Sequence, residues 1–303
     1  MSNSDSTSRQ NVEFTSEGIT CRGWLTYPKA NTKQAVPLVI MAHGFGATRE
    51  MCLEQYAQRF NAAGMATFIF DYRHFGASDG TPRHVLVPQK EIKDWHAALA
   101  YARTLPNIDK SKIALWGTSF AGGLVVTVAA QDGKVAATVS QCPMLDGLAA
   151  VFEIAKYAGP LSLLKVSVHG LVDAARGILG ASPHYIPTVA NSGEVGAMTS
   201  ADAMDGYLRL TQPGYRNEVS ARTGLLVPIF RPIRDAARVK CPALLQICEK
   251  DSVAPISAVE KAAKKMAKAE VVRYPLGHFD VYFGNAFERS VSDQLTFLQK
   301  HLF

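Results

Sequence analysis

A serine, an acid and a histidine, the side chains that together perform acyl transfer, each follow a predicted strand in this chain. Ser119 lies in the segment Gly117–Gly123, GTSFAGG, between an apolar strand pattern and an apolar helix pattern. A sharp strand-to-helix turn needs small neighbours, because larger side chains would collide with the adjacent strand and helix. The pattern is G-x-S-x-A, so by itself it also fits a glycine-rich turn with an incidental serine. The segment makes Ser119 a candidate nucleophile.

A serine hydroxyl attacks only when a base takes its proton and a third group orients that base. Asp251 comes soon after the strand pattern Ala243–Cys248, and His278 comes soon after the strand pattern Glu270–Tyr274. The parallel order of these strands would bring both loops to the sheet edge that carries Ser119. We therefore predict Ser119 as nucleophile, His278 as base and Asp251 as the orienting acid.

Other residues compete for two of these roles. Asp146 also follows a strand pattern, and Asp280 lies close to His278 in sequence. Asp251 is favoured over Asp146 because it follows the penultimate strand, and Asp280 is too near the histidine to orient it. His43 is the main competing histidine, and its place before a Gly-Phe-Gly segment indicates that it shapes a loop.

The oxyanion that forms during acyl transfer needs two backbone N–H donors. One is predicted at Phe120, directly after the nucleophile, and the other at Phe45, in the loop after an early strand. The six histidines other than His43 and His278 lack metal-ligand spacing, so we predict no metal and no other cofactor.

Strand and helix patterns alternate along most of the chain. Short apolar runs typical of central strands covered on both faces lie at Pro37–Ala42, Ala66–Asp71, Lys112–Trp116, Val135–Gln141, Ala243–Cys248 and Glu270–Tyr274. Helix patterns lie at Glu50–Ala63, Val87–Leu105, Leu124–Gln131, Ile256–Ala269 and Ala286–Leu302. Ile19–Tyr27 alternates like an exposed edge strand. The alternation predicts an α/β fold with a mostly parallel, doubly wound sheet.

This alternation stops after residue 146 and resumes near residue 236. We predict an α/β core of residues 11–146 and 236–303, and a helical cap insertion of residues 147–235 over the carboxyl edge of the sheet. We expect the apolar side chains of the insertion to be buried on the core or to line a substrate pocket; they are Leu161, Leu163, Leu164, Leu171, Val172, Ile178 and Leu179. Residues 1–10 are polar and are predicted to form a disordered tail rather than a signal peptide.

Composition narrows the classes of partner and compartment. The net charge of +6 comes from scattered basic residues, so nucleic acid is not an expected partner. The uncharged stretch Ile113–Ala130 is interrupted by glycines and is interpreted as a strand and a helix, not as a membrane span. Five cysteines without paired spacing favour reduced thiols and a cytoplasmic location. The sequence leaves a homodimer open.

The loop after the strand Ala66–Asp71 carries two Arg-His pairs, at residues 73–74 and 83–84. Such pairs at the carboxyl edge of a sheet could recognise a carboxylate or a phosphate. The favoured interpretation is that Arg73 braces the loop through Asp79 or a backbone carbonyl.

From residue 11 to residue 303 the chain resembles an α/β-hydrolase. Asp71–Gly80, Gly117–Gly123 and Gly277–Tyr282 resemble segments of dienelactone-hydrolase-like, acetyl-xylan-esterase-like and X-prolyl-peptidase-like enzymes, and of fungal polyketide transferases and thioesterase-like hydrolases. Ala121 stands where the family pattern has a second glycine. The resemblance implies a serine hydrolase, but this fold supports many chemistries.

The resulting hypothesis is a serine hydrolase that cleaves small carboxylic esters or thioesters with an apolar acyl part, through an acyl-enzyme on Ser119. An acyl or polyketide transferase would use the same intermediate with another acceptor, and an amidase or peptidase would use the same triad. A binding protein without catalysis is disfavoured because all three triad candidates are present.

Overall fold

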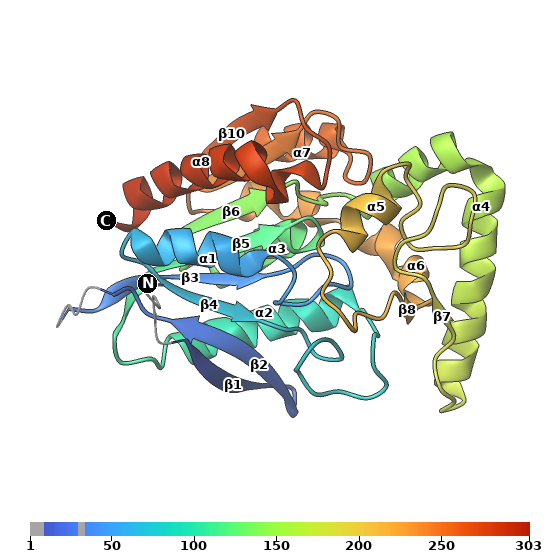
Figure 1. The fold of residues 1–303 in the computed structure, drawn as a ribbon, viewed down its shortest axis with the longest axis horizontal. Helices are drawn as coiled ribbons and strands as arrows, with labels where there is room; N and C mark the ends of the chain where they lie inside the picture. Colours follow the sequence, from blue (N-terminus) through green and yellow to red (C-terminus); the bar gives the residue numbers. More distant parts are fainter. Residues whose placement is uncertain (1–8, 30–33) are drawn as a thin grey trace, which may run out of the picture.

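The protein is built around one eight-stranded sheet (Figure 1). The computed structural model describes residues 9–29 and 34–303. The strand order is β1-β2-β4-β3-β5-β6-β9-β10, with β1, β2 and β4 joined in antiparallel fashion and the remaining pairs parallel. Its strands are β1 (Gln10–Ser16), β2 (Ile19–Thr26), β3 (Val36–Ala42), β4 (Ala66–Phe70), β5 (Ile108–Thr118), β6 (Ala137–Gln141), β9 (Ala243–Cys248) and β10 (Ala269–Tyr274). The predicted mostly parallel α/β sheet is confirmed.

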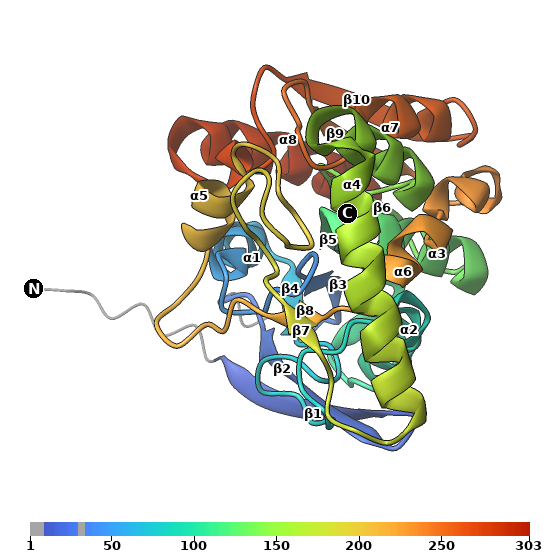
Figure 2. The same cartoon turned by 90° about the vertical axis from the view of Figure 1, so that its right-hand side faces the viewer.

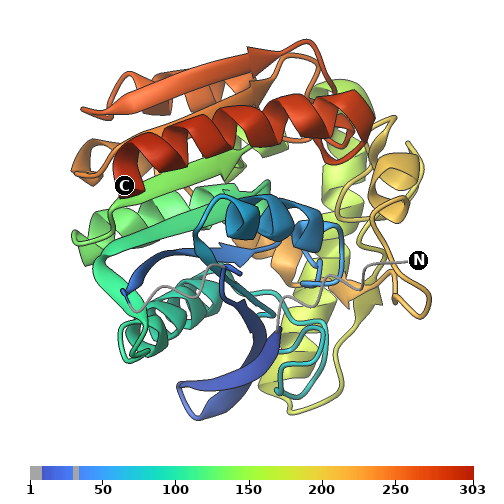
Figure 3. The same ribbon diagram turned by 60° about the vertical axis from the view of Figure 1, so that its left-hand side comes forward.

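The strands β4, β6 and β9 are buried along their whole length because each face of the sheet has its own core. In β3, Leu38 and Ile40 pack into one hydrophobic cluster, while Val39 and Met41 pack into the other. One face is covered by α2 (Pro88–Ala102), α3 (Phe120–Asp132) and α7 (Ile256–Ala263), and the other by α1 (Leu53–Ala62) and α8 (Gly284–Leu302). Figure 3 shows α1 and α8 lying side by side on their face of the sheet.

Two predictions about the edges of the sheet are wrong. β2 is not an edge strand, because β1 pairs with its residues 19–25 and β4 pairs with its other side. β1 begins at Gln10, the last residue of the predicted disordered tail; residues 1–8 of that tail lie outside the described residues. β10 is an edge strand rather than a central one, and Val271 on it is 42 % exposed. β1 escaped prediction because it is polar, with only Phe14 and Ser16 buried.

A long segment between β6 and β9 covers the carboxyl ends of the parallel strands (Figures 1 and 2). Residues 147–235 of this segment are called the cap below. Its elements are α4 (Gly147–Ile178), β7 (Tyr185–Ile186), α5 (Ala203–Leu208), β8 (Val219–Ser220), α6 (Thr223–Leu226) and the 3₁₀ turns η1 (Val227–Ile229), η2 (Pro232–Arg234) and η3 (Ala236–Arg238). The remaining 3₁₀ turn, η4 (Asp280–Tyr282), follows β10. β7 and β8 form a short antiparallel pair that the sequence does not reveal. Because β6 and β9 are neighbours in the sheet, we propose that residues 147–235 are an insertion into an otherwise continuous core.

α4 is the outermost element of this segment (Figure 2). Its helical backbone is interrupted at Gly159, where φ is 78°, and Pro160 begins the second half. Within the described part of the chain, α4 is the one helix whose length and composition would suffice to cross a membrane, and 11 % of its most apolar window is buried. The expectation that its apolar side chains are buried is wrong for six of the seven residues, which are exposed: Leu161, Leu164, Leu171, Val172, Ile178 and Leu179.

The loop after β4 is braced by a buried ion pair. The Arg73 guanidinium donates to the carboxylate of Asp94 on α2 at 2.8 Å and also contacts Glu17 and the Ser16 hydroxyl. The expected partner Asp79 instead binds Arg22. Arg73 therefore braces its loop, as favoured, but through a helix and the β1–β2 turn rather than through its own loop.

The Asp94→Ala substitution should lower the free energy of unfolding by about 3–5 kcal/mol, because it leaves the Arg73 charge buried without its nearest carboxylate. Urea unfolding followed by circular dichroism measures this loss. Arg59→Ala, which removes one member of the exposed pair with Glu288, is the control and should change stability little. Equal, small losses for both variants would contradict the assigned role of Arg73 and Asp94.

Asp173 holds α4 against the rest of the cap. Its carboxylate accepts hydrogen bonds from the Arg222 guanidinium and from the backbone N–H groups of Arg222 and His184. Burial raises the pKa of Asp173, but these hydrogen bonds outweigh burial and bring it from 3.8 to about 2. The carboxylate is thus more stable in the folded protein than in the unfolded chain.

A depressed folded-state pKa contributes stability that is fully present above pH 3.8 and is lost as the pH falls toward 2. Asp173→Asn should therefore be less stable than the wild type at pH 6, and the difference should shrink between pH 4 and pH 2. Parallel denaturant titrations of the two proteins test this, and a pH-independent difference would show that the ion pair is not its source.

Candidate active site

Ser119 occupies a strained turn between β5 and α3. Its backbone has φ 55° and ψ −118°, a region that residues with a side chain rarely adopt. Two backbone hydrogen bonds hold the turn: the Ser119 N–H donates to the Gln141 carbonyl at 2.8 Å, and the Ser119 carbonyl accepts from the Met144 N–H at 2.9 Å. The loop after β6 thereby fixes the serine at the carboxyl edge of the sheet.

Two glycines make this turn sterically feasible. A Cβ on Gly117 would lie 2.3 Å from the Ala121 carbonyl oxygen, closer than real Cβ contacts allow. A Cβ on Gly44, in the loop after β3, would lie 2.9 Å from the Ser119 Cβ. The turn therefore needs glycine at position 117 and also at position 44 of the facing loop. Ala121 fits inside α3 and is fully buried.

Ser119, His278 and Asp251 form a continuous hydrogen-bonded series. The Ser119 Oγ lies 2.9 Å from His278 Nε2, and His278 Nδ1 lies 2.7 Å from Asp251 Oδ2. Since a carboxylate only accepts, Nδ1 carries the imidazole proton and Nε2 is free to accept from the serine hydroxyl. The second oxygen of Asp251 accepts from the N–H groups of Val253 and Ala254, so the acid has one orientation. The side chains of His278 and Asp251 are both buried.

The three competing residues are used elsewhere. Asp146 caps α4 and forms a bidentate ion pair with Arg231. Burial raises the pKa of the Asp146 carboxyl, but the Arg231 hydrogen bonds and the α4 N–H groups outweigh it and leave the pKa below its usual value. Asp280 accepts from the Gly277 N–H and closes a turn.

His43 shapes the loop after β3, as the sequence indicates. Its Nδ1 accepts from the Gly44 N–H at 2.8 Å, which places the ring proton on Nε2, opposite the Met51 carbonyl at 2.7 Å. Burial lowers the pKa of His43 to about 4, so the ring stays neutral in the physiological range. It is a fixed support for Gly44 rather than a proton carrier.

The predicted oxyanion donors lie on two loops that touch. The site of a Gly44 Cβ is 3.4 Å from the Phe120 nitrogen, so the loop that carries Phe45 borders the N-terminus of α3. The rings of Phe45 and Phe120 meet edge to face with centroids 5.7 Å apart. Tyr207 donates its hydroxyl to the Phe45 carbonyl at 2.9 Å and fixes that peptide. A helix N-terminus beside a nucleophile favours negative charge, as an oxyanion site requires.

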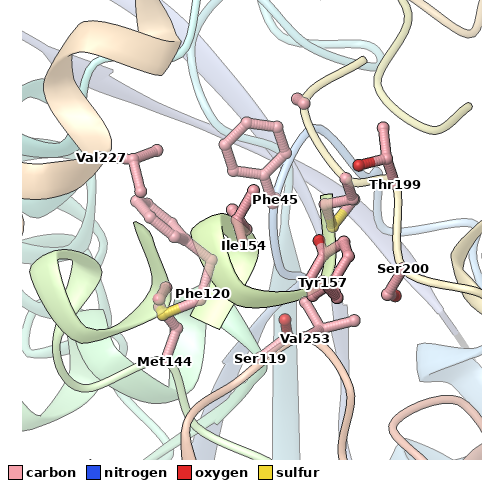
Figure 4. A pocket seen from close by; sticks show the side chains of 13 residues that line it. Phe45, Ser119, Phe120, Met144, Ile154, Tyr157, Thr199, Ser200, Val227 and Val253 are labelled. Carbon is pink, nitrogen blue, oxygen red and sulfur yellow. The ribbon is translucent and has the colours of Figure 1, made fainter. Parts of the chain in front are cut away.

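An apolar pocket opens above the serine (Figure 4). Its empty space is about 530 Å³, counting the open space at its mouth. The core contributes Ser119 and four apolar side chains: Phe45, Phe120, Met144 and Val253. The cap contributes the remaining lining, which is also mainly apolar: Ala150, Ile154, Tyr157, Ala197, Met198, Thr199, Ser200 and Val227. The serine hydroxyl thus faces an enclosure suited to an apolar group.

The model of the serine aminopeptidase S33 family, a family of hydrolases, matches residues 33–278. The chain belongs to this α/β-hydrolase family. The hydrolase is 42 % identical over 291 residues to the quorum-quenching protein AidA of Acinetobacter baumannii, covering 95 % of this chain and 94 % of that one. It is 27 % identical to a thiohydrolase of Eupenicillium brefeldianum, covering 96 % and 94 % of the two chains.

A solved structure shares the fold. The α/β-hydrolase GrgF from a Penicillium species superposes on the present hydrolase with a TM-score of 0.82 at 28 % identity, covering 97 % of this chain and 99 % of that one. GrgF is named a polyketide transferase. These similarities establish an enzyme of the α/β-hydrolase type.

The cap of the hydrolase is tied to the loop that carries Asp251. Ser252, next to Asp251, donates its hydroxyl to the Asp202 carboxylate and lies 3.0 Å from the Ser200 hydroxyl. Ser200 also lines the pocket. The cap thus contacts the core at the loop of Asp251 as well as around Ser119.

One group of ligand-type side chains lies inside this site. Cys142, Asp251 and His278 offer sulfur, oxygen and nitrogen atoms within 4.8 Å of one another. Asp251 and His278 already bind each other, and Cys142 lies 3.2 Å from Cys248. The contact with Cys248 and burial both raise the pKa of the Cys142 thiol, which opposes the thiolate form that metals bind. The absence of a metal stays a prediction.

Sequence reasoning missed the cap residues of the pocket. Tyr157, Met198 and Val227 have no distinguishing signal, because an apolar residue in a helical insertion reads the same whether it faces the core, the pocket or solvent. Only the Gly159 break divides α4 into the half over the pocket and the half beyond it.

Substituting Asp251 by Asn should lower kcat by about 10⁴-fold while the fold persists, because an amide would favour the wrong imidazole tautomer. Steady-state hydrolysis of an activated ester measures the loss. The matched control is Asp146→Asn. It weakens the hydrogen bonds that Asp146 makes at the N-terminus of α4 and with Arg231, so it should reduce stability more than turnover. The assignment of the acid is wrong if Asp146→Asn removes turnover and Asp251→Asn does not.

Proposed function

We propose that this hydrolase cleaves small carboxylic esters or thioesters with an apolar acyl part, through an acyl-enzyme on Ser119. The observation that carries the proposal is the Asp251–His278–Ser119 series opening into an apolar pocket. The hydrogen bonds supply an activated nucleophile, and the pocket supplies a place for the acyl chain. The enzyme would need no metal or cofactor for this reaction.

In the first step, Ser119 Oγ attacks the substrate carbonyl carbon and gives its proton to His278 Nε2. The imidazolium is stabilised by Asp251 through Nδ1–H. Negative charge on the former carbonyl oxygen would be received by the backbone N–H groups of Phe45 and Phe120, and such a donor is typically worth about 3 kcal/mol. The tetrahedral intermediate collapses, His278 returns the proton to the leaving alcohol or thiol, and the acyl group stays on Ser119.

In the second step, His278 takes a proton from a water molecule whose oxygen attacks the acyl carbon. Collapse of the second intermediate breaks the bond to Ser119 Oγ, which recovers its proton from His278. The products are one carboxylic acid and one alcohol or thiol, and the enzyme regains its starting protonation.

The relatives support acyl chemistry on small molecules. Their names include a thiohydrolase and a quorum-quenching protein, and both similarities extend over nearly the whole chain. We propose a cytoplasmic location for the enzyme, supported by the free state of all five cysteines.

Acyl or polyketide transfer is the second candidate function. It is favoured by the apolar lining of the pocket, which lowers the local availability of water, and by the similarity to a polyketide transferase at 29 % identity over 302 residues. Product analysis with and without added alcohols or amines separates the two, since a transferase forms the conjugate at the expense of the free acid. The family description also names an aminopeptidase, and matched ester and amide substrates test amide cleavage.

A panel of activated esters and thioesters with increasing acyl length tests the proposal. The wild type should show an optimum in kcat/KM, and Ser119→Ala should lower activity by about 10⁵–10⁶-fold. Ile154→Ala should move the optimum to longer chains, because it removes a side chain that narrows the pocket. Val271→Ala, on the distant edge strand, is the control. Ester turnover that survives in Ser119→Ala would overturn the proposal.

A further inference from the structure

The second half of α4 presents an apolar stripe that none of the described residues covers. The stripe consists of seven side chains whose exposed fractions lie between 46 % and 87 %: Leu161, Leu164, Val168, Leu171, Val172, Ile178 and Leu179. Figure 2 shows this part of α4 lying on the outside of the cap. The stripe leaves on the order of 700 Å² of apolar surface exposed, which exceeds the roughly 300–600 Å² of the largest patch on a typical monomer.

The opposite side of the same helix is firmly packed. Gly170 and Asp173 are buried, and Asp173 is bound by Arg222. A Cβ on Gly170 would lie 2.8 Å from the Leu225 side chain, so the cap approaches α4 closely there. The exposure of the stripe is therefore not the result of a loosely placed helix.

The stripe has the spacing of a coiled-coil seam. Five of its residues, together with the exposed Ala175 in the same row, advance in steps of three and four, as the a and d positions of a heptad do; the positions are 161, 164, 168, 171, 175 and 178. Val172 and Leu179 lie beside this row and widen the stripe. Such a 3.5-residue period matches the ridge of another helix, whereas a helix face lying on lipid needs only a broad apolar sector. The spacing favours a helical partner.

The same six positions are symmetric about the point between residues 169 and 170. An antiparallel copy of the helix would place Leu161 opposite Ile178, Leu164 opposite Ala175 and Val168 opposite Leu171, each pair repeated by a twofold axis. In this arrangement the large Leu164 side chain faces the small Ala175 side chain, which suits close packing.

The area of the stripe agrees with an interface between two copies. Its exposed surface of about 700 Å² per copy approaches the roughly 800 Å² per partner of a stable interface.

We infer that the stripe is the interface of a homodimer in which the two α4 helices pair antiparallel through Leu161–Ile178. The first half of α4 carries Ala150, Ile154 and Tyr157 over the catalytic pocket, and the second half continues it beyond the Gly159 break. The dimer buries the stripe and fixes the outer end of the helix whose inner end roofs the pocket.

Light scattering coupled to size-exclusion chromatography tests the assembly. The wild type should elute with about twice the chain mass of 32.8 kDa at micromolar concentration, and Leu171→Lys should elute as a monomer. Val271→Lys places the same charge on an exposed apolar residue of β10 and should remain dimeric. Circular dichroism and thermal unfolding establish that the variants are folded. A monomeric wild type, or a dimeric and folded Leu171→Lys, overturns the inference.

Cross-linking tests the register. The double variant Leu164→Cys/Ala175→Cys should form a covalent dimer under mild oxidation, while neither single variant should. Mixing the two single variants should give a cross-linked heterodimer. Cross-linking of either single variant alone would indicate a parallel pair and contradict the antiparallel register.

Vesicles of phosphatidylcholine and phosphatidylglycerol distinguish a membrane partner. The wild type should not float with the vesicles. Flotation of a monomeric wild type that is lost in Leu171→Lys would assign the stripe to a lipid surface and overturn the dimer.

Discussion

The close approach of two loops at the carboxyl edge of the sheet is the constraint on which the site depends. Gly44 and Ser119 lie so near each other that a methyl group on the glycine would collide with the serine side chain. This contact fixes Ser119 beside the loop of Phe45, one of the two expected oxyanion donors. The strained φ of 55° at Ser119 persists because two backbone hydrogen bonds hold the turn. The Ser119 N–H donates to Gln141 at the end of β6, and the Ser119 carbonyl accepts from Met144 in the loop that follows.

A separate buried hydrogen-bond network joins strands of the sheet to the helix α8. Gln294 of α8 accepts from the indole N–H of Trp116 on β5 and donates to the side-chain oxygens of Gln141 on β6 and Gln246 on β9. Such a network ties one helix to three strands and rigidifies the ends from which the catalytic loops start. The His278 loop lies between β10 and α8, so α8 anchors the chain on its far side.

The sequence predicts the parts of this protein that require special residues or long apolar runs. The strand at Ala243–Cys248 is predicted to the residue because it is buried on both faces, and the glycines around Ser119 mark their turn because no larger residue fits. β1 was missed since it is polar and pairs only through one neighbour. Ser119, His278 and Asp251 lie in one hydrogen-bonded series, and their catalytic roles stay predictions.

The cap is where sequence reasoning fails, for a physical reason. An apolar residue on an isolated helix signals burial but not the surface that buries it. Ile154 faces the pocket, Val166 is half-buried in the cap, and Leu164 faces outward, although all three are aliphatic residues on α4. Only the three-dimensional arrangement separates a pocket wall from a packing face and from an exposed seam.

The most direct measurement of the central claim is covalent labelling by a fluorophosphonate, followed by intact-mass analysis and peptide mapping. One adduct per chain is expected on the peptide that contains Ser119, with no labelling of Ser119→Ala and slow labelling of Asp251→Asn. Labelling that persists in Ser119→Ala, or an adduct that maps to another residue, would contradict the assignment of the nucleophile.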